Sequence, residues 1–204
     1  MALSDGVGRE AVMLARSSIE SSLSGKGAGR AAPNVGPFGE PRGVFVTINR
    51  AEHTPERLRG CIGFPYPVKP LGEAIQEAAR AAAMEDPRFP PVSKSELGSI
   101  VLEVSILTPP RPLSASSPRD LPSKVRIGTD GLIISRYGAS GLLLPQVATE
   151  FGMDPVVFLS QACMKAGLPP DSWLDKETEV QTFQAEIFAE TEPRGRVERQ
   201  SPSD

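Results

Sequence analysis

The segment ERLRGCIGF holds the residues of this chain that are best suited to chemistry, and its centre is Cys61, one of only two cysteines. Two arginines lie just upstream, and glycines lie on both sides of the thiol (Arg57, Arg59, Gly60 and Gly63). Nearby guanidinium groups favour thiolate over thiol, and the thiolate is the form that attacks electrophiles, binds soft metals or is oxidised. The glycines would leave the sulfur open to a ligand or a partner backbone. The segment therefore predicts a reactive or ligand-binding cysteine.

A second interpretation of the same segment is structural. Free cysteine is among the most buried residue types, and glycines allow a bend or close packing against a neighbouring helix. In this interpretation Cys61 is a small core residue. The general behaviour of cysteine favours the structural interpretation over chemistry, and the compactness of the segment narrows this preference without reversing it.

Three charged residues elsewhere are weaker candidates for binding. In EDPRFP, Arg88 could hold a carboxylate or phosphate bidentately with Asp86 orienting it, or the two could form an ion pair that fastens the loop. Glu103 is the one charge in the apolar run SIVLEVSIL, so it is either a buried partner of an arginine or an edge residue facing water.

The single histidine, His53, lies eight positions before Cys61 and is either a solvated loop residue or a base for the thiol. A zinc site would need about four nitrogen or sulfur ligands, which this chain does not supply. Counting residues leaves room for a carboxylate-rich iron site, but no closely spaced His-x-Asp or His-x-Glu motif supports one. We therefore predict no metal site, and the residues do not identify a cofactor.

The elements that must position Cys61 follow from hydrophobic periodicity. GVFVTIN and RLRGCIGF read as two strands of a hairpin, and the period of two would place Arg59 and Cys61 on the same face. LGEAIQEAARAAAMED predicts a helix with a face of small residues that ends near Asp86, where Pro87 follows.

The remaining elements are a helix over 5–23, a strand over SIVLEVSILTPP and a hairpin at Asp130-Gly131. A second hairpin is expected near GASG. A helix capped by Asp154 would bury Cys163, and EVQTFQAEIFAE has the alternation of one strand. Strands joined by hairpins, with helices around them, predict an α+β fold with a mainly antiparallel sheet.

Composition narrows the class of protein. With 22 basic and 25 acidic residues the net charge is −3, so there is no positive field to favour nucleic acid. No apolar run is long enough to span a membrane, and the first residues lack the order of a signal peptide, so we expect a cytoplasmic protein with reduced thiols.

The stretch LRGCIG, residues 58–63, resembles the six-residue signature of the AMMECR-one domain family, named after a human chromosomal region linked to Alport syndrome, midface hypoplasia and elliptocytosis. Three further stretches are similar to family blocks in the same order: DPRFPPVSKSEL with IVLEVSILTPP, IGTDGLIISRYGASGLLLPQVATEFG, and FLSQACMKAGLPPDSW. The resemblance covers roughly Asp5 to Glu190.

The resemblance implies one domain over 5–190 with an α+β fold, a large subdomain and a smaller one, followed by a disordered tail over 191–204. The resemblance does not fix the boundary between the subdomains; if the small one lies near CIGFPYPVKP and the next helix, the cleft between them would expose Cys61. The resemblance implies no activity, because the biochemical function of the family is not established. Family members are found fused to, or encoded with, Memo-type proteins and radical S-adenosylmethionine proteins, which implies a link to a redox or radical modification pathway.

Two hypotheses of function follow. In the first, the chain is a binding or adaptor module whose RLRGCIG face holds a partner protein or a small anionic ligand. In the second, it is a thiol-dependent enzyme or redox component with Cys61 as nucleophile or carrier and the arginines stabilising negative charge. The scarcity of histidine and the lack of a clear general base count against the second.

Overall fold

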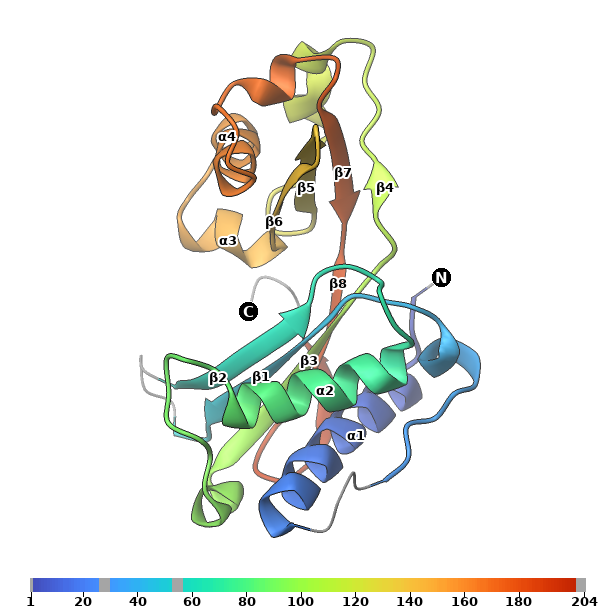
Figure 1. Ribbon diagram of the computed structural model, residues 1–204, viewed down its shortest axis with the longest axis vertical. Coiled ribbons are helices and arrows are strands. Elements are labelled where there is room, and N and C mark those ends of the chain that lie inside the picture. Colours follow the sequence, from blue (N-terminus) through green and yellow to red (C-terminus); the bar gives the residue numbers. More distant parts are fainter. Residues whose placement is uncertain (1, 26–29, 53–56, 201–204) are drawn as a thin grey trace. The chain divides into compact units, whose positions relative to one another are not determined.

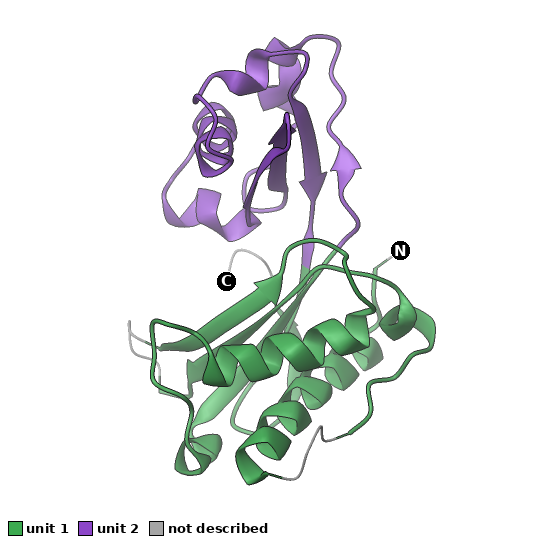
Figure 2. Ribbon diagram, in the orientation of Figure 1, with its two compact units in different colours: residues 1–107, 186–200 green, residues 108–185, 201–204 purple. Residues whose placement is uncertain are grey.

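The computed structural model describes residues 2–25, 30–52 and 57–200 of the 204. The chain forms two compact units, one built from Met1–Leu107 and Glu186–Gln200 and the other from residues 108–185 (Figure 2). His53 lies outside the described residues, so its two predicted roles stay open.

The first unit is a five-stranded sheet with two long helices. Its strands lie in the order β2-β1-β3-β8-β9. Strand β1 pairs antiparallel with both β2 and β3, and β8 pairs antiparallel with β9. Its elements are α1 (Asp5–Ser24), a 3-10 turn (Gly36–Gly39), β1 (Val44–Arg50), β2 (Leu58–Phe64), α2 (Leu71–Met84), a 3-10 turn (Lys94–Gly98), β3 (Ile100–Leu107), β8 (Ala185–Glu190) and β9 (Val197–Gln200).

Both helices cover the same face of this sheet (Figure 1). The small buried residues of α2 (Ala74, Ala78, Ala79, Ala82 and Ala83) let that helix approach β1 and β2 closely, while α1 packs over β3 and β9. Val46, Ile48 and Val104 are fully buried in the core between sheet and helices. The alternation of side chains along a strand therefore directs the neighbouring residues of β1 and β3 to the opposite face.

The second unit has its own core around a four-stranded sheet in the order β4-β7-β5-β6. Its elements are β4 (Arg111–Pro112), a 3-10 helix (Pro118–Lys124), β5 (Gly131–Arg136), β6 (Ala139–Leu143), α3 (Pro145–Glu150), α4 (Pro155–Lys165), a 3-10 turn (Ser172–Leu174) and β7 (Glu179–Phe183). Asp154 caps α4 through the backbone N–H of Val157, and Cys163, on the buried face of that helix, is fully buried, as predicted. The α+β class is confirmed, since both units combine helices with antiparallel strand pairs.

Four sequence predictions about the fold are wrong. The smaller unit is residues 108–185, whereas CIGFPYPVKP and α2 belong to the large one. The tail is not disordered throughout, because β9 pairs with β8 and so gains backbone hydrogen bonds and burial.

The segment EVQTFQAEIFAE is two strands, because the chain passes at Gln184 from one sheet to the other. Asp130-Gly131 is not a hairpin turn, because the Asp130 carboxylate accepts the backbone N–H of Arg126 and closes a turn before β5. The second reversal, predicted near GASG, is confirmed, since β5 and β6 form a hairpin that turns at Tyr137 and Gly138, which both have positive φ.

Candidate functional site

A row of three polar side chains crosses the large sheet around Cys61. Thr47 of β1 lies directly opposite Cys61 of β2 on one side and Glu103 of β3 on the other. Directly opposed residues of neighbouring strands share a face, so the three side chains form one line. The Thr47 hydroxyl donates a hydrogen bond to the Cys61 sulfur at 3.3 Å. We call these residues the Cys61 row.

The Cys61 row lies on the sheet face that α1 and α2 leave uncovered. Thr47 lies between Val46 and Ile48, both fully buried in the core under the helices. Cys61 and Glu103 are half-buried. The hydrogen-bonding groups of the row are therefore separate from the apolar core of this unit.

Asp86 and Arg88 together hold the backbone of Cys61 at the outer edge of the sheet. The Asp86 carboxylate accepts the Cys61 N–H at 2.8 Å, and Arg88 Nη2 donates to the Cys61 carbonyl at 3.3 Å. The two side chains also pair with each other, with Nη2 to Oδ2 at 2.7 Å and Nε to Oδ1 at 3.0 Å. Asp86 is buried, whereas the Arg88 side chain is 53% exposed. Asp86 and Arg88 therefore form the ion pair of the structural alternative, while about half of the Arg88 side chain still reaches solvent.

Arg59 fastens a loop and does not act on the thiol. The register of β1 and β2 shifts between Ile48 and Asn49, which leaves Arg59 as the extra residue of a bulge. Its side chain donates to Glu96 at 2.7 Å and to the Pro91 carbonyl at 3.2 Å. The prediction that Arg59 and Cys61 are neighbours on one face is therefore wrong, because the bulge interrupts the period of two.

The two glycines of LRGCIG are required by packing. A Cβ atom at Gly60 would lie 2.2 Å from the Ala82 carbonyl oxygen of α2, and one at Gly63 would lie 2.5 Å from the Phe45 ring. Neither distance is compatible with a side chain. Each glycine permits a close approach within the protein, so neither serves to leave the sulfur uncluttered for a ligand.

The thiol of Cys61 favours its protonated form. Burial raises its pKa above the ordinary value and outweighs the Thr47 hydrogen bond and the charge of Arg88, both of which lower it. The carboxylates of Glu103 and Asp86 raise it further. The prediction of a thiolate stabilised by Arg57 and Arg59 is wrong in direction, and Arg88 is the arginine whose charge acts on the sulfur.

Glu103 occupies a central strand, so of its two predicted settings the partly buried one is correct. Burial raises the pKa of its carboxyl group, while the positive charge of Arg57 and a hydrogen bond from Ser105 at 3.5 Å lower it. Arg57 itself is exposed. Its guanidinium group is thus associated with the Glu103 end of the row, and that of Arg88 with the Cys61 end.

Thr47 is the member of the site that sequence reasoning missed. Its only signal was a polar residue in the apolar run VFVTIN, at the position that alternates away from the core.

No three His, Cys, Asp or Glu side chains of the described segments lie close enough together to hold a metal ion. Within the same segments no helix has both the length and the apolar character needed to cross a membrane.

The family model AMMECR1 matches residues 12–188, which is most of the chain. The chain belongs to the AMMECR1 family. The family prediction made from LRGCIG and the three collinear blocks is thereby confirmed. A match of this kind assigns no role to a residue, so the roles of the Cys61 row rest on its geometry.

Relatives in archaea are similar along nearly their whole length. A protein of Methanothermobacter thermautotrophicus is 54% identical over 191 residues, which cover 92% of this chain and 96% of that one. Protein MJ0810 of Methanocaldococcus jannaschii is 49% identical, with 93% of each chain covered. The crystal structure of the uncharacterised protein PH0010 from Pyrococcus horikoshii superimposes with a TM-score of 0.81 at 48% identity, covering 95% of this chain and 96% of that chain.

Proposed function

We propose that this AMMECR1-family chain is a cytoplasmic binding or adaptor module that holds a partner protein or a small anionic ligand at the Cys61 row. The observation that carries the proposal is the alignment of Cys61, Thr47 and Glu103 across three strands on the face without helices. Three hydrogen-bonding side chains in one line on paired strands are already held in position, which lowers the entropic cost of ordering them when a ligand binds.

The charges beside the row favour a polar or anionic group. Arg57 and Arg88 are exposed guanidinium groups associated with opposite ends of the row. A guanidinium group binds carboxylate or phosphate through paired hydrogen bonds, and Asp86 already holds Arg88 in a fixed orientation. Arg59, Gly60 and Gly63 contribute by fixing the shape of β2.

The protonated state of the thiol supports binding over catalysis. A thiol-dependent enzyme needs Cys61 as thiolate, and burial together with two carboxylates opposes its formation. Thr47 donates to the sulfur and takes no proton from it, so it is no base for the thiol. The alternative, a thiol-dependent enzyme or redox component, is tested below with the variant Cys61→Ser.

The test uses the partners that the family association implies, the Memo-type protein and the radical S-adenosylmethionine protein of the same organism. Each is titrated by calorimetry against the full chain and against Arg57→Gln, Arg88→Gln and Glu103→Gln. Losing one charged hydrogen bond at an interface should weaken binding about tenfold. Arg111→Gln, on exposed β4 of the other unit, is the matched control and should bind like the unaltered chain.

Cys61→Ser separates the two hypotheses. A binding module should keep its affinity within about threefold, since serine preserves the size and the hydrogen bond of the side chain. If instead Cys61→Ser eliminates a measured activity while binding is retained, the thiol chemistry is real. If neither protein binds, or if all variants bind equally, the Cys61 row is not the binding surface.

A further inference from the structure

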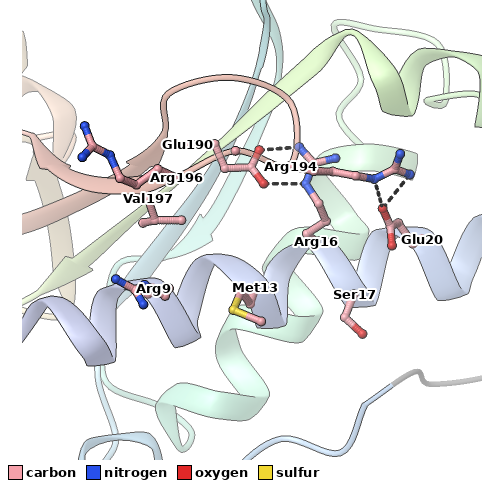
Figure 3. Close-up of a pocket in the computed structure, with 10 residues that line it drawn as sticks. Arg9, Met13, Arg16, Ser17, Glu20, Glu190, Arg194, Arg196 and Val197 are labelled. Carbon is pink, nitrogen blue, oxygen red and sulfur yellow. Dashed lines mark hydrogen bonds and ion pairs between the residues drawn. The ribbon is translucent and has the colours of Figure 1, made fainter.

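A cavity lies in the large unit, between α1 and the turn that joins β8 to β9 (Figure 3). Its volume is about 570 Å³, which is within the range of roughly 300 to 1,000 Å³ seen for small-molecule sites. Its walls contain no residue of the Cys61 row. The residues that line it include Arg9, Met13 and Ser17 of α1 and Gly195, Arg196 and Val197 of the turn and β9.

A buried ion pair fixes the base of the cavity. Arg16 Nε donates to Glu190 Oε1 at 2.6 Å, and the side chains are only 8% and 4% exposed. Arg16 also donates to the Ile100 carbonyl at 2.9 Å, and Glu190 accepts the backbone N–H of Leu102 at 2.9 Å. Because these groups are satisfied by the protein, the pair holds α1 against β8 and is not available to a ligand.

The turn opposite α1 is also held in place. Arg194 has a positive φ of 60°, which non-glycine residues rarely adopt, and its side chain donates to Glu20 of α1 at 2.9 and 3.0 Å. Thr191 N–H donates to the Arg196 carbonyl at 2.9 Å. The cavity is therefore preformed, with its two glutamates already committed to Arg16 and Arg194.

Positive charge remains at one end of the cavity. Figure 3 shows Arg9 and Arg196 at the end near Val197, away from the paired Arg16 and Arg194. No acceptor within the described part of the chain pairs with the Arg9 guanidinium group. Arg196 pairs with Glu198, but both side chains are largely in water, at 76% and 42% exposed. Exposed ion pairs of this kind contribute little to stability, so another anion can take the place of Glu198 beside Arg196.

Apolar atoms lie between the two ends. Met13 is 51% exposed although it is a large hydrophobic residue, and Val197 packs partly against the main core. Burying exposed apolar surface such as that of Met13 is favourable, and methionine adapts its shape to the group that covers it. The cavity thus combines an apolar surface with two available guanidinium groups.

We propose that this cavity binds a small amphiphilic anion. The apolar body of the ligand lies on Met13 and Val197, and its carboxylate or phosphate group accepts hydrogen bonds from Arg9 and Arg196. This site is independent of the Cys61 row and needs no covalent step.

The first test is a fluorescence titration of the full chain with 8-anilinonaphthalene-1-sulfonate, an aromatic body with one anionic group. N-phenyl-1-naphthylamine, which has a similar body and no charge, is the matched control probe. We expect the sulfonate to bind more tightly than the amine, and Arg9→Gln or Arg196→Gln to weaken its binding about tenfold by removing a charged hydrogen bond. Met13→Glu should abolish it, because a carboxylate then occupies the apolar surface.

Arg111→Gln is the control variant, and circular dichroism checks that each chain is folded. Equal binding of both probes, or unchanged sulfonate binding in Arg9→Gln and Met13→Glu, would overturn the proposal. Competition then identifies the anionic group: displacement of the sulfonate by phenyl phosphate indicates phosphate, and displacement by benzoate indicates carboxylate. Displacement by neither also overturns the proposal.

Discussion

Asp86 takes the place of a neighbouring strand for Cys61. Strand β2 is at the edge of its sheet, where backbone groups normally lack a partner strand. The Asp86 carboxylate accepts the Cys61 N–H at 2.8 Å, and it also binds Arg88, which donates to the Cys61 carbonyl at 3.3 Å. Two side chains from the loop after α2 thereby satisfy both edge groups of one residue.

Asp86→Asn should therefore destabilise the large unit. The variant loses the ionic hydrogen bonds to Arg88 and weakens the bond to Cys61, at a cost of about 2 kcal/mol in the free energy of unfolding. Urea denaturation measures this change, with exposed Asp120→Asn as the control. If the two variants have equal stability, Asp86 does not support the strand.

The ion pair between Arg59 and Glu96 should make stability depend on pH in the acid range. The Arg59 hydrogen bond, aided by Ser93, lowers the pKa of Glu96 from 4.5 to about 2 despite partial burial. Because the folded pKa is below the unfolded one, the contribution is fully present above pH 4.5 and is lost as the pH falls towards 2.

Glu96→Gln removes this dependence. We expect the difference in unfolding free energy between the unaltered chain and the variant to shrink progressively as the pH falls through this range. Other carboxylates with lowered pKa, such as Asp130, are present in both chains and cancel in the difference. A difference that stays constant with pH would show that Glu96 is not held ionised by Arg59.

Gly60→Ala tests whether the glycines of LRGCIG are structural. The added methyl group would lie 2.2 Å from the Ala82 carbonyl oxygen, and backbone cannot move away cheaply. We expect a loss of about 2 to 3 kcal/mol from overpacking, measured by thermal and urea denaturation. Gly98→Ala is the matched control, since its added methyl group would meet no atom within 4 Å and should be nearly neutral.

The local elements could be predicted from the sequence because their signals are local. The period of two in VFVTIN and the alanines of the following helix are sufficient to predict β1 and α2, and the Asp154-Pro155 pair predicts the start of α4. The family resemblance implied two subdomains, but the place where they divide could not be predicted, because EVQTFQAEIFAE alternates continuously through Gln184 while the chain changes sheets there.

The sequence singled out several residues around Cys61 but missed Thr47 and the contacts among them. Cys61, Asp86 and Arg88 were each candidates, yet nothing in the sequence showed that a carboxylate 25 positions away would bind the Cys61 N–H. The bulge at Arg59 has no sequence signal either. Burial of the thiol, which depends on the whole fold, is the main cause that raises the pKa of Cys61 and opposes the predicted thiolate. Contacts between distant segments and small register shifts depend on the whole fold, whereas period and propensity describe only the neighbours in sequence.

The pH dependence of Cys61 alkylation should separate the effects of Thr47 and Glu103 on the pKa of the thiol. The rate of alkylation by iodoacetamide, measured against pH and located by peptide mass spectrometry, should rise at a higher pH than for free cysteine, because burial raises the pKa of the thiol. Thr47→Val removes the hydrogen bond that lowers this pKa, so the midpoint should shift upward. Glu103→Gln removes a negative charge that raises it, so the midpoint should shift downward.

Cys163, which is fully buried, is the internal control and should react only on unfolding. Fast labelling of Cys61 at neutral pH, or shifts of the same sign in both variants, would contradict this account of the row and restore the thiolate hypothesis.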